Sequence, residues 1–264
     1  MGYNKAMPHS PLDRLRDRLP INDPYDGVVA DAYDTWIPVD EAWPDEELYR
    51  QALVDVTGTI LELGCGTGRP LVRWLADGLD IEGLDASADM LGVLRRHAKE
   101  RGLEPTLHHA DFAPLAIDRS YGAIVCLAGT FMLVDDEELV QRSLASYLQH
   151  LEPRGLLGVS LGVFNTDPSG SLLWRLRRTG TSDDGITYVV HEAVHTDLSR
   201  RTELVYNRVE TYDRDGRLLE TTMRRHRLRG WEREEFEAAL TRIGFDDVHS
   251  IGDENAWVSF GRRP

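Results

Sequence analysis

The stretch ILELGCGTGR, residues 60–69, joins a short apolar run to three glycines in the spacing G-x-G-x-G. The run 59–63 is typical of a β-strand, and a helix is predicted over 69–76 directly after the glycines. Glycines at such a junction allow a tight turn and let the backbone approach a ligand closely. Asp85 ends the next predicted strand, 21 residues after Gly64, and its carboxylate could accept hydrogen bonds from both hydroxyls of a ribose. These positions lie at the carboxyl ends of strands, which is where open α/β sheets bind ligands.

The kind of ligand follows from the details of this loop. The glycine spacing differs from the G-x-G-x-x-G of dinucleotide-binding folds, and no Lys-Ser or Lys-Thr follows to cradle a phosphate. Asp111 and Phe112 end the third predicted strand, where a carboxylate and an adjacent backbone N–H could read an adenine edge. A nucleoside without phosphates fits this set of residues.

Strands and helices alternate from residue 59 to residue 163, after a loose arm and two predicted helices. The strand segments are short and nearly continuously apolar, which indicates a buried parallel sheet with helices on both faces, and so an α/β fold. The expected strands are 59–63, 79–84, 105–109, 121–127 and 155–163, and the expected helices are 26–36, 44–56, 69–76, 87–99 and 135–151.

The alternation stops after residue 163. Residues 165–185 are polar and irregular, whereas 186–229 predict three antiparallel strands with a hairpin turn at DRDG, 213–216. A helix over 231–243 and strands over 245–250 and 256–261 are then expected to complete the core. The expected division is an N-terminal arm and lid helices (1–56, with a loose arm over 1–24), a cofactor-binding core (57–163), an antiparallel insertion (164–229) and a returning helix with strands (230–264).

Composition restricts the partners of the protein. The 264 residues carry 30 Lys and Arg against 45 Asp and Glu, a formal net charge of −15. Such a surface repels phosphate backbones and anionic lipid, so nucleic acid and membranes are disfavoured and a small-molecule acceptor is expected. Two cysteines are too few for a disulfide scaffold, and no targeting segment is recognised, so a cytoplasmic enzyme is expected, with a homodimer as one option.

Several stretches together resemble the class I S-adenosylmethionine-dependent methyltransferases. They are ILELGCGTGR (60–69), GLDAS with Met90 (83–90), HADF (109–112), YGAIVCLAGTF (121–131) and LEPRGLLGVSL (151–161). The resemblance implies a Rossmann-like seven-stranded sheet with helices on both faces, and an antiparallel insertion after the fifth strand that acts as a lid. It also implies S-adenosyl-L-methionine as cofactor, with S-adenosyl-L-homocysteine as product.

The same resemblance implies a set of cofactor contacts. The methionine portion would lie along Gly64, Cys65, Gly66 and Gly68, with Glu62 anchoring that loop and the Leu127 backbone receiving the amine. The nucleoside would contact Asp85 at the ribose, and Ala86, Met90, Asp111 and Phe112 at the adenine. Tyr25 and Tyr33 are expected to reach the cofactor from the N-terminal helix.

The insertion resembles those of small-molecule methyltransferases of bacterial secondary metabolism, such as amino-sugar and glycine-type N-methyltransferases. No motif fixes the acceptor, which is an amine or a hydroxyl. The predicted acceptor contacts are Trp36, Thr130, Phe131, Trp174, Tyr188 and Tyr206, and the predicted general bases are His191 and His226. The alternative is a cofactor-binding fold used for other chemistry, such as a cyclase, or a binding subunit.

The run His191-Glu-Ala-Val-His195 matches the H-E-x-x-H motif of zinc hydrolases. Its flanks are rich in Val, Thr and Tyr, which is typical of a strand. On a strand, positions i and i+4 lie roughly 13 Å apart, too far for two ligands of one zinc ion. No metal site is therefore expected.

Overall fold

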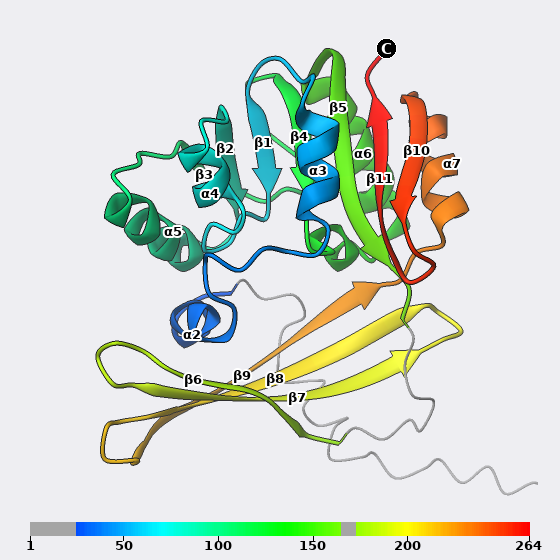
Figure 1. Cartoon of the computed structure of the whole chain (residues 1–264). Coiled ribbons are helices and arrows are strands. Elements are labelled where there is room, and N and C mark those ends of the chain that lie inside the picture. The colour runs from blue at the N-terminus through cyan, green and yellow to red at the C-terminus, as the bar shows by residue number, and fades with distance from the viewer. Residues whose placement is uncertain (1–24, 165–172) are drawn as a thin grey trace, which may run out of the picture.

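The computed structural model describes residues 25–164 and 173–264. The arm expected over 1–24 lies outside these residues, as does 165–172. The described chain forms two sheets, one above the other in Figure 1, with a short helix between them. No helix in the described ranges is long and apolar enough to cross a membrane.

The larger sheet has seven strands in the order β10-β11-β5-β4-β1-β2-β3. Neighbours from β5 to β3 pair in parallel, whereas β11 pairs antiparallel with both β5 and β10. This is the predicted Rossmann-like sheet. Its strands are β1 (Ile60–Leu63), β2 (Ile81–Asp85), β3 (Leu107–His109), β4 (Tyr121–Cys126), β5 (Leu151–Gly162), β10 (Asp246–Gly252) and β11 (Ala256–Arg262).

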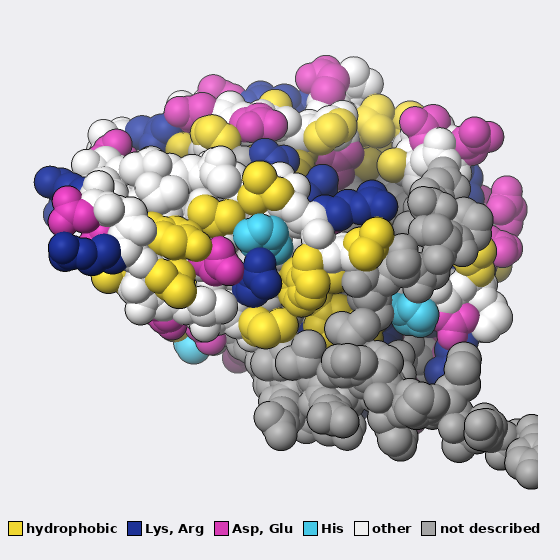
Figure 2. All heavy atoms as spheres, turned by 90° about the horizontal axis from the view of Figure 1, so that it is seen from below, with side chains coloured by type: hydrophobic (Ala, Val, Ile, Leu, Met, Phe, Trp, Pro, Cys, Tyr) yellow, Lys and Arg dark blue, Asp and Glu magenta, His cyan; other side chains and the backbone are white. Residues whose placement is uncertain are grey.

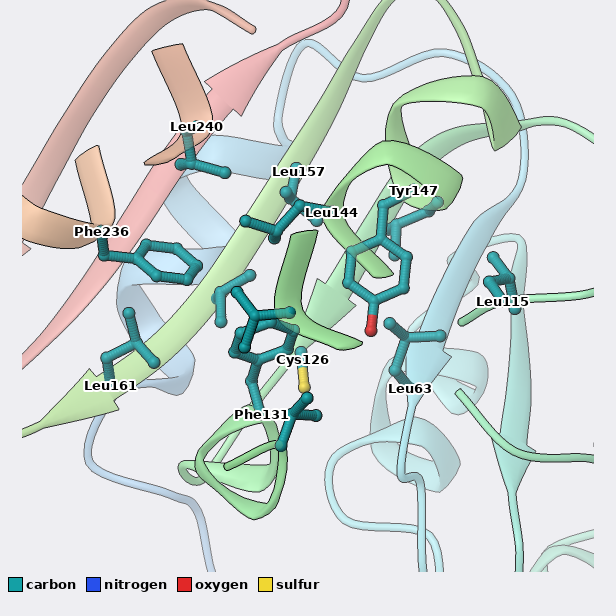
Figure 3. Packing of buried hydrophobic residues seen from close by; sticks show 14 of the residues in the cluster. Leu63, Leu115, Cys126, Phe131, Leu144, Tyr147, Leu157, Leu161, Phe236 and Leu240 are labelled. Carbon is teal, nitrogen blue, oxygen red and sulfur yellow. The ribbon is translucent and has the colours of Figure 1, made fainter. Parts of the chain in front are cut away.

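Helices cover both faces of this sheet, because alternate residues of each central strand are apolar on opposite sides. Ile124 and Cys126 of β4 join one core cluster, whereas Ala123 and Val125 join the other. The first cluster packs under α6 (Glu137–His150) and α7 (Arg233–Ile243), as Figure 3 shows for Tyr147 and Phe236. The second lies under α3 (Glu46–Leu53), α4 (Leu71–Ala76) and α5 (Ala88–Glu100).

The smaller sheet, here called the lid sheet, follows β5 in the chain. It has four antiparallel strands in the order β6-β7-β8-β9, and residues 213–216 make the expected turn between the last two. The prediction of three strands missed β6, because this edge strand is mostly exposed and its sequence RLRRTGT has no apolar alternation. The strands are β6 (Arg175–Thr181), β7 (Thr187–Asp197), β8 (Thr202–Tyr212) and β9 (Leu218–Arg229).

The two faces of the lid sheet have different surroundings. On the inner face, Tyr188, Val190 and Val209 pack against Val29 and Ala32 of α2 (Val28–Trp36), the helix that lies between the two sheets. The opposite, outer face carries a cluster of Ala193, Leu204 and Tyr206, with Trp174 packed against it. The insertion therefore lies over one end of the core sheet, with its inner face against α2.

Candidate functional site

A hollow opens at the carboxyl ends of β1 and β4. Its walls come from the glycine loop, from the turn after β4 and from the segment that leads from α2 into α3. The lining residues are Tyr33, Trp43, Glu62, Gly64, Cys65, Gly66, Thr67, Arg69, Leu127, Ala128 and Thr130. Sequence reasoning predicted seven of these as site residues from the loop, the strand end and α2, and missed Trp43, Thr67, Arg69 and Ala128.

The glycines of the loop are needed for its shape. Gly64 has φ +67°, and a Cβ there would come within 2.5 Å of Cγ2 of Thr130 on the facing turn. Gly66 has φ +51° and nothing within 4 Å of the place of a Cβ, so its backbone faces open space. A left-handed backbone favours glycine at both positions, and the open side of Gly66 suits close approach of a ligand.

Asp85 holds the glycine loop and the start of α5 together. One carboxylate oxygen accepts the Gly66 amide at 2.8 Å, and the other accepts the Ser87 amide at 2.9 Å. Burial raises the pKa of Asp85, while these two backbone bonds act in the opposite direction. Each oxygen keeps a further lone pair, which fits the predicted contact with ribose hydroxyls.

Ser87 joins the same site to the N-terminal segment. Its hydroxyl caps α5, accepting the Met90 amide at 3.0 Å, and donates to a carboxylate oxygen of Asp26 at 2.6 Å. Met90 itself is buried with Ala30 and Val93 under the rings of Tyr25 and Tyr33. The predicted adenine side of the site is therefore closed by α2.

Glu62 lines the hollow and is almost fully buried. Its Oε2 has no hydrogen-bond partner within the described ranges. Burial, with the charges of Glu46 and Asp85, raises the pKa of Glu62 well above its usual value. An orphaned buried oxygen costs free energy unless a donor reaches it, so this wall fits a ligand with a polar hydrogen, such as the methionine amine of the cofactor.

Seven predicted cofactor contacts are not among the residues that line the hollow: Tyr25, Gly68, Asp85, Ala86, Met90, Asp111 and Phe112. The Ala86 carbonyl meets a ring nitrogen of His109 at 3.0 Å, and a carboxylate oxygen of Asp111 accepts the Ala113 amide at 2.9 Å. The Phe112 carbonyl accepts the hydroxyl of Tyr147. The predicted roles of Ala86, Asp111 and Phe112 toward adenine stay predictions.

Arg69 is the main lining residue that sequence reasoning missed. Its guanidinium is nearly fully buried, bonds the Pro38 and Ile37 carbonyls, and stacks 5.2 Å from the centre of the Tyr33 ring. A charged residue directly after the last glycine, at the start of an apolar helix, was the signal available for it. Trp43 gave no such signal, because its place in the wall depends on where the segment before α3 crosses the sheet.

A line of aromatic rings leads from the hollow to the lid sheet. The rings of Tyr33 and Tyr25 meet edge to face at 5.9 Å, and the ring of Tyr25 lies 6.3 Å from His226 on β9. The Arg224 guanidinium stacks 3.5 Å from the centre of the Tyr25 ring. Burial raises the pKa of Tyr33 to about 12, so its phenol is neutral at physiological pH.

His226 is buried on the inner face, and its Nδ1 has no hydrogen-bond partner in the described ranges. Burial, followed by the charge of Arg224, lowers the pKa of His226 to about 3. The imidazole is therefore neutral at physiological pH and has an unused polar nitrogen facing the protein interior.

Of the other predicted acceptor residues, only Thr130 lines the hollow among the residues that the structure describes. His191 pairs in register with Arg208 on β8, and Arg208 pairs with Met223 on β9. Met223 lies three residues from His226, so the two histidines are on opposite faces of the sheet. Tyr206 and Trp174 are also on the outer face. Thr130 lines the hollow, Tyr188 packs on α2, and Trp36 ends that helix.

Phe131 corrects the sequence interpretation. It is fully buried in the core, where its ring contacts those of Tyr147, Trp231 and Phe236. The backbone after Thr130 turns this side chain toward α6 and α7, and Phe131 does not line the hollow. In the turn after β4, Thr130 therefore lines the hollow, whereas its neighbour Phe131 packs in the core.

The H-E-x-x-H sequence lies on β7, the strand environment that its flanks predict. Across residues 25–164 and 173–264, no three His, Cys, Asp or Glu side chains gather closely enough to hold a metal ion.

Comparison with known proteins gives consistent matches. The model of a methyltransferase domain matches residues 60–155. A dTDP-3-amino-3,6-dideoxy-alpha-D-glucopyranose N,N-dimethyltransferase from Streptomyces fradiae is 29% identical over 70% of this chain and 69% of its own length. A dTDP-3-amino-3,4,6-trideoxy-alpha-D-glucopyranose N,N-dimethyltransferase from Streptomyces venezuelae is 32% identical over 38% of this chain, and the match spans only 41% of that relative. Among solved structures, a sugar N-methyltransferase from Streptoalloteichus superposes with a TM-score of 0.71 at 19% identity, over 92% of this chain and 96% of the other, a likeness of fold.

Proposed function

We propose that this chain, whose residues 60–155 match a methyltransferase domain, uses S-adenosylmethionine to methylate an amine of a small molecule, of the amino-sugar kind. The observation that carries this proposal is His226, a buried neutral imidazole joined to the cofactor hollow through Tyr25 and Tyr33. The acceptor would enter between the turn after β4 and the inner face of the lid sheet.

The cofactor would lie along the glycine loop. Asp85 would receive the ribose hydroxyls, while Glu62 and the Leu127 backbone would receive the methionine amine. When bound, S-adenosylmethionine supplies a methyl group on a positively charged sulfonium. The protein then needs to hold the acceptor in line with that methyl group and to exclude water, and such placement can supply most of the acceleration.

The pKa of His226 favours an amine over a hydroxyl. A hydroxyl must lose its proton as it attacks, which calls for a base with a pKa near the working pH. A pKa of about 3 is poorly matched to that task. A neutral amine attacks without help. The Nδ1 of His226, which has no partner among residues 25–164 and 173–264, would accept an N–H of the amine and orient the lone pair of its nitrogen.

Charge and relatives support the same acceptor. The net charge of −15 suits an amine or a neutral polar molecule better than a polyanion. Two relatives bear the names of amino-sugar N,N-dimethyltransferases, and both come from Streptomyces. We propose a role in secondary metabolism on that basis.

The test is a transfer assay with S-adenosylmethionine and matched pairs of deoxysugars, in free and nucleotide-linked forms, that carry either an amine or a hydroxyl at the same carbon. Mass spectrometry should show addition of methyl groups to the amine compounds only. Methylation of the hydroxyl partners alone would overturn the amine assignment. Tight cofactor binding with no transfer to any compound would instead favour a fold used for other chemistry.

A homodimer in the cytoplasm remains a proposal. The exposed side chains of Leu176, Leu218 and Leu219 on the outer strands of the lid sheet would support association. Sedimentation at several protein concentrations tests the dimer, and cell fractionation tests the location.

A further inference from the structure

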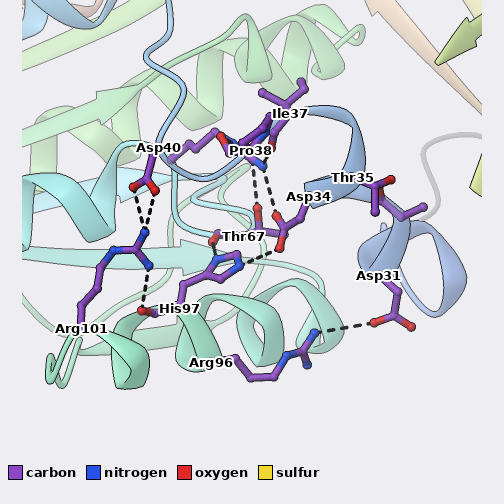
Figure 4. A network of polar contacts seen from close by, with 12 residues as sticks. Asp31, Asp34, Thr35, Ile37, Pro38, Asp40, Thr67, Arg96, His97 and Arg101 are labelled. Atoms are coloured by element: carbon purple, nitrogen blue, oxygen red, sulfur yellow. Dashed lines mark hydrogen bonds and ion pairs between the residues drawn. The ribbon is translucent and has the colours of Figure 1, made fainter. Parts of the chain in front are cut away.

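A segment that we call the strap, residues 31–46, crosses α4 and α5 and closes one side of the cofactor hollow. Polar contacts hold it there, as Figure 4 shows in part. Arg101, the C-cap residue of α5, makes two bonds to the Asp40 carboxylate, at 2.8 and 3.0 Å. Arg73 of α4 donates to the carbonyls of Val39 at 2.7 Å and Glu41 at 3.0 Å. The strap therefore rests on the core mainly through side-chain contacts.

One contact joins the strap to the glycine loop itself. His97 of α5 lies between the two, with Nε2 at 2.7 Å from a carboxylate oxygen of Asp34 and Nδ1 at 2.8 Å from the carbonyl of Thr67. Arg69 reaches the other oxygen of Asp34 at 3.1 Å and the Thr67 hydroxyl at 3.0 Å. Thr67 and Arg69 line the hollow, as does Tyr33, the residue next to Asp34.

The geometry of His97 defines its charge state. Both ring nitrogens face oxygen atoms that can only accept, a carboxylate oxygen and a peptide carbonyl. A neutral imidazole has one N–H and one lone pair, so one of these contacts would bring two lone pairs together. Only the imidazolium, with two N–H groups, satisfies both.

The charges around His97 act in the same direction. Asp34 faces it from α2 and Glu100 from its own helix, and both favour the charged ring, while Arg69 lies on the far side of the Asp34 carboxylate. Burial opposes the charge, yet the pKa of His97 is raised overall. The bond from His97 helps to keep the pKa of Asp34 below its usual value.

We propose that the Asp34–His97 ion pair is a positioning device that closes the strap on the glycine loop, so that protonation of His97 strengthens cofactor binding. Closing the pair holds Tyr33 and Thr67 in the wall of the hollow. When His97 loses its proton, the contact with Asp34 or with Thr67 is lost, and the strap is released from the loop. This role concerns the cofactor alone and does not depend on which acceptor the protein uses.

The pKa shifts of His97 and Asp34 determine how cofactor affinity should depend on pH. The pKa of His97 is raised in the closed state. The contribution of the charged His97 to closure of the strap is therefore complete below the ordinary pKa of 6.5 and is lost as pH rises through the raised pKa. The pKa of Asp34 is lowered, so its contribution is lost only in acid, as pH falls through the lowered value. Cofactor affinity should therefore decline on the alkaline side of neutrality.

The experiment is calorimetric titration of the whole chain with S-adenosylhomocysteine across the range from about pH 6 to about pH 9. In the wild type the dissociation constant should rise about tenfold, the factor that one pKa unit of coupling gives. His97→Gln should bind weakly at all pH values and lose this rise. Asp34→Asn should retain tight binding at alkaline pH, because an Asn amide donates to a neutral imidazole that still donates to Thr67.

Asp40→Asn is the matched control, since it removes a strap ion pair to the same helix without touching the glycine loop. It should shift affinity little and keep the wild-type pH dependence. An identical rise in the wild type and in His97→Gln would overturn the proposal. If His97→Gln does not fold, NMR titration of the wild-type ring provides the answer: its pKa should increase when S-adenosylhomocysteine binds, and an unchanged pKa would equally refute the coupling.

Discussion

His191 and His226 lie on opposite faces of the lid sheet, although both are neighbours of the same strand β8. His191 pairs with Arg208, and His226 pairs with Val205, three positions away. Because side chains alternate along a strand, an odd offset places the two imidazoles on different sides. Only His226 shares its side with Tyr25 and α2.

The two histidines should therefore respond differently to substitution. His226→Ala should lower kcat/KM about 10- to 100-fold, a loss typical of one group that orients a reacting atom. His191→Ala should leave kcat/KM within about twofold, because the sheet separates it from the hollow. Steady-state kinetics with the amine acceptor that emerges from the transfer assay would measure both, and equal losses would argue against the assignment of the inner face.

Asp85 offers a test of the cofactor site that needs no acceptor. Asp85→Ala removes a carboxylate that fixes the Gly66 amide and is placed for the ribose. Hydrogen bonds to charged groups contribute about 1.5–3 kcal/mol, so affinity for S-adenosylhomocysteine should fall about 10- to 100-fold.

Asp111→Ala is the comparison for Asp85, since Asp111 is exposed beside the hollow and bonds only the local Ala113 amide among the contacts described. Its affinity loss should stay below about tenfold. Calorimetry gives both values. Unchanged affinity in Asp85→Ala would remove the ribose assignment.

The packing of Gly64 against Thr130 predicts a strong effect of one methyl group. Gly64→Ala would place a Cβ 2.5 Å from Cγ2 of Thr130, in addition to the backbone strain at φ +67°. Gly102→Ala has nearly the same φ, +68°, with nothing within 4 Å. The control Gly102→Ala should lose only about 1–2 kcal/mol of folding stability, the cost of a left-handed backbone for a residue with a Cβ. Gly64→Ala should lose more stability and should also lose cofactor affinity.

Thr130→Ser in the Gly64→Ala background removes the clashing methyl group and should restore part of the loss. Urea unfolding and calorimetry follow the two properties separately. Equal destabilisation by Gly64→Ala and Gly102→Ala would show that the contact with Thr130 is unimportant.

Because Glu62 is buried, the wild type and Glu62→Gln should differ in folding stability by an amount that depends on pH. Its pKa is raised in the folded protein by burial, so the ionised carboxylate costs stability once pH rises above the ordinary value of 4.5. Glu62→Gln has no charge to lose, and without ligand it should be more stable than the wild type by about 1–2 kcal/mol at about pH 8. The difference should vanish at about pH 4, where the wild-type carboxyl is protonated in both states. Urea unfolding at the two pH values measures it, and a difference independent of pH would contradict the assigned cause.

The predictability of the site differs from one residue to another. Gly64, Gly66 and Asp85 could be assigned because strand, turn and carboxylate follow one another locally in the chain, and local order fixes them at one sheet edge. The place of Arg69 depends on partners more than 30 residues away, the carbonyls of Ile37 and Pro38. The ion pair of Asp34 with His97 likewise joins segments that only the fold brings together.

In the lid sheet, too, the local sequence predicted the strands, whereas distant contacts decided which way their faces point. Apolar alternation was sufficient to predict β7, β8 and β9 as strands, and the H-E-x-x-H sequence as part of one. It could not show which face of these strands meets the core, since both faces carry aromatic and histidine side chains. The contact of α2 with Tyr188 and Val190 decided that question and placed His226 inside and His191 outside.

By itself, the sequence determined the alternating core, the glycine loop and its acidic partner, because these follow from patterns within a few residues and from the side-chain periods of helix and strand. The tertiary structure alone decided the faces of the lid sheet, the burial of Phe131 in the core, and the closure of the strap through His97. Each of these depends on contacts between segments far apart in the chain. Their energies come from burial and pairing that no local pattern contains.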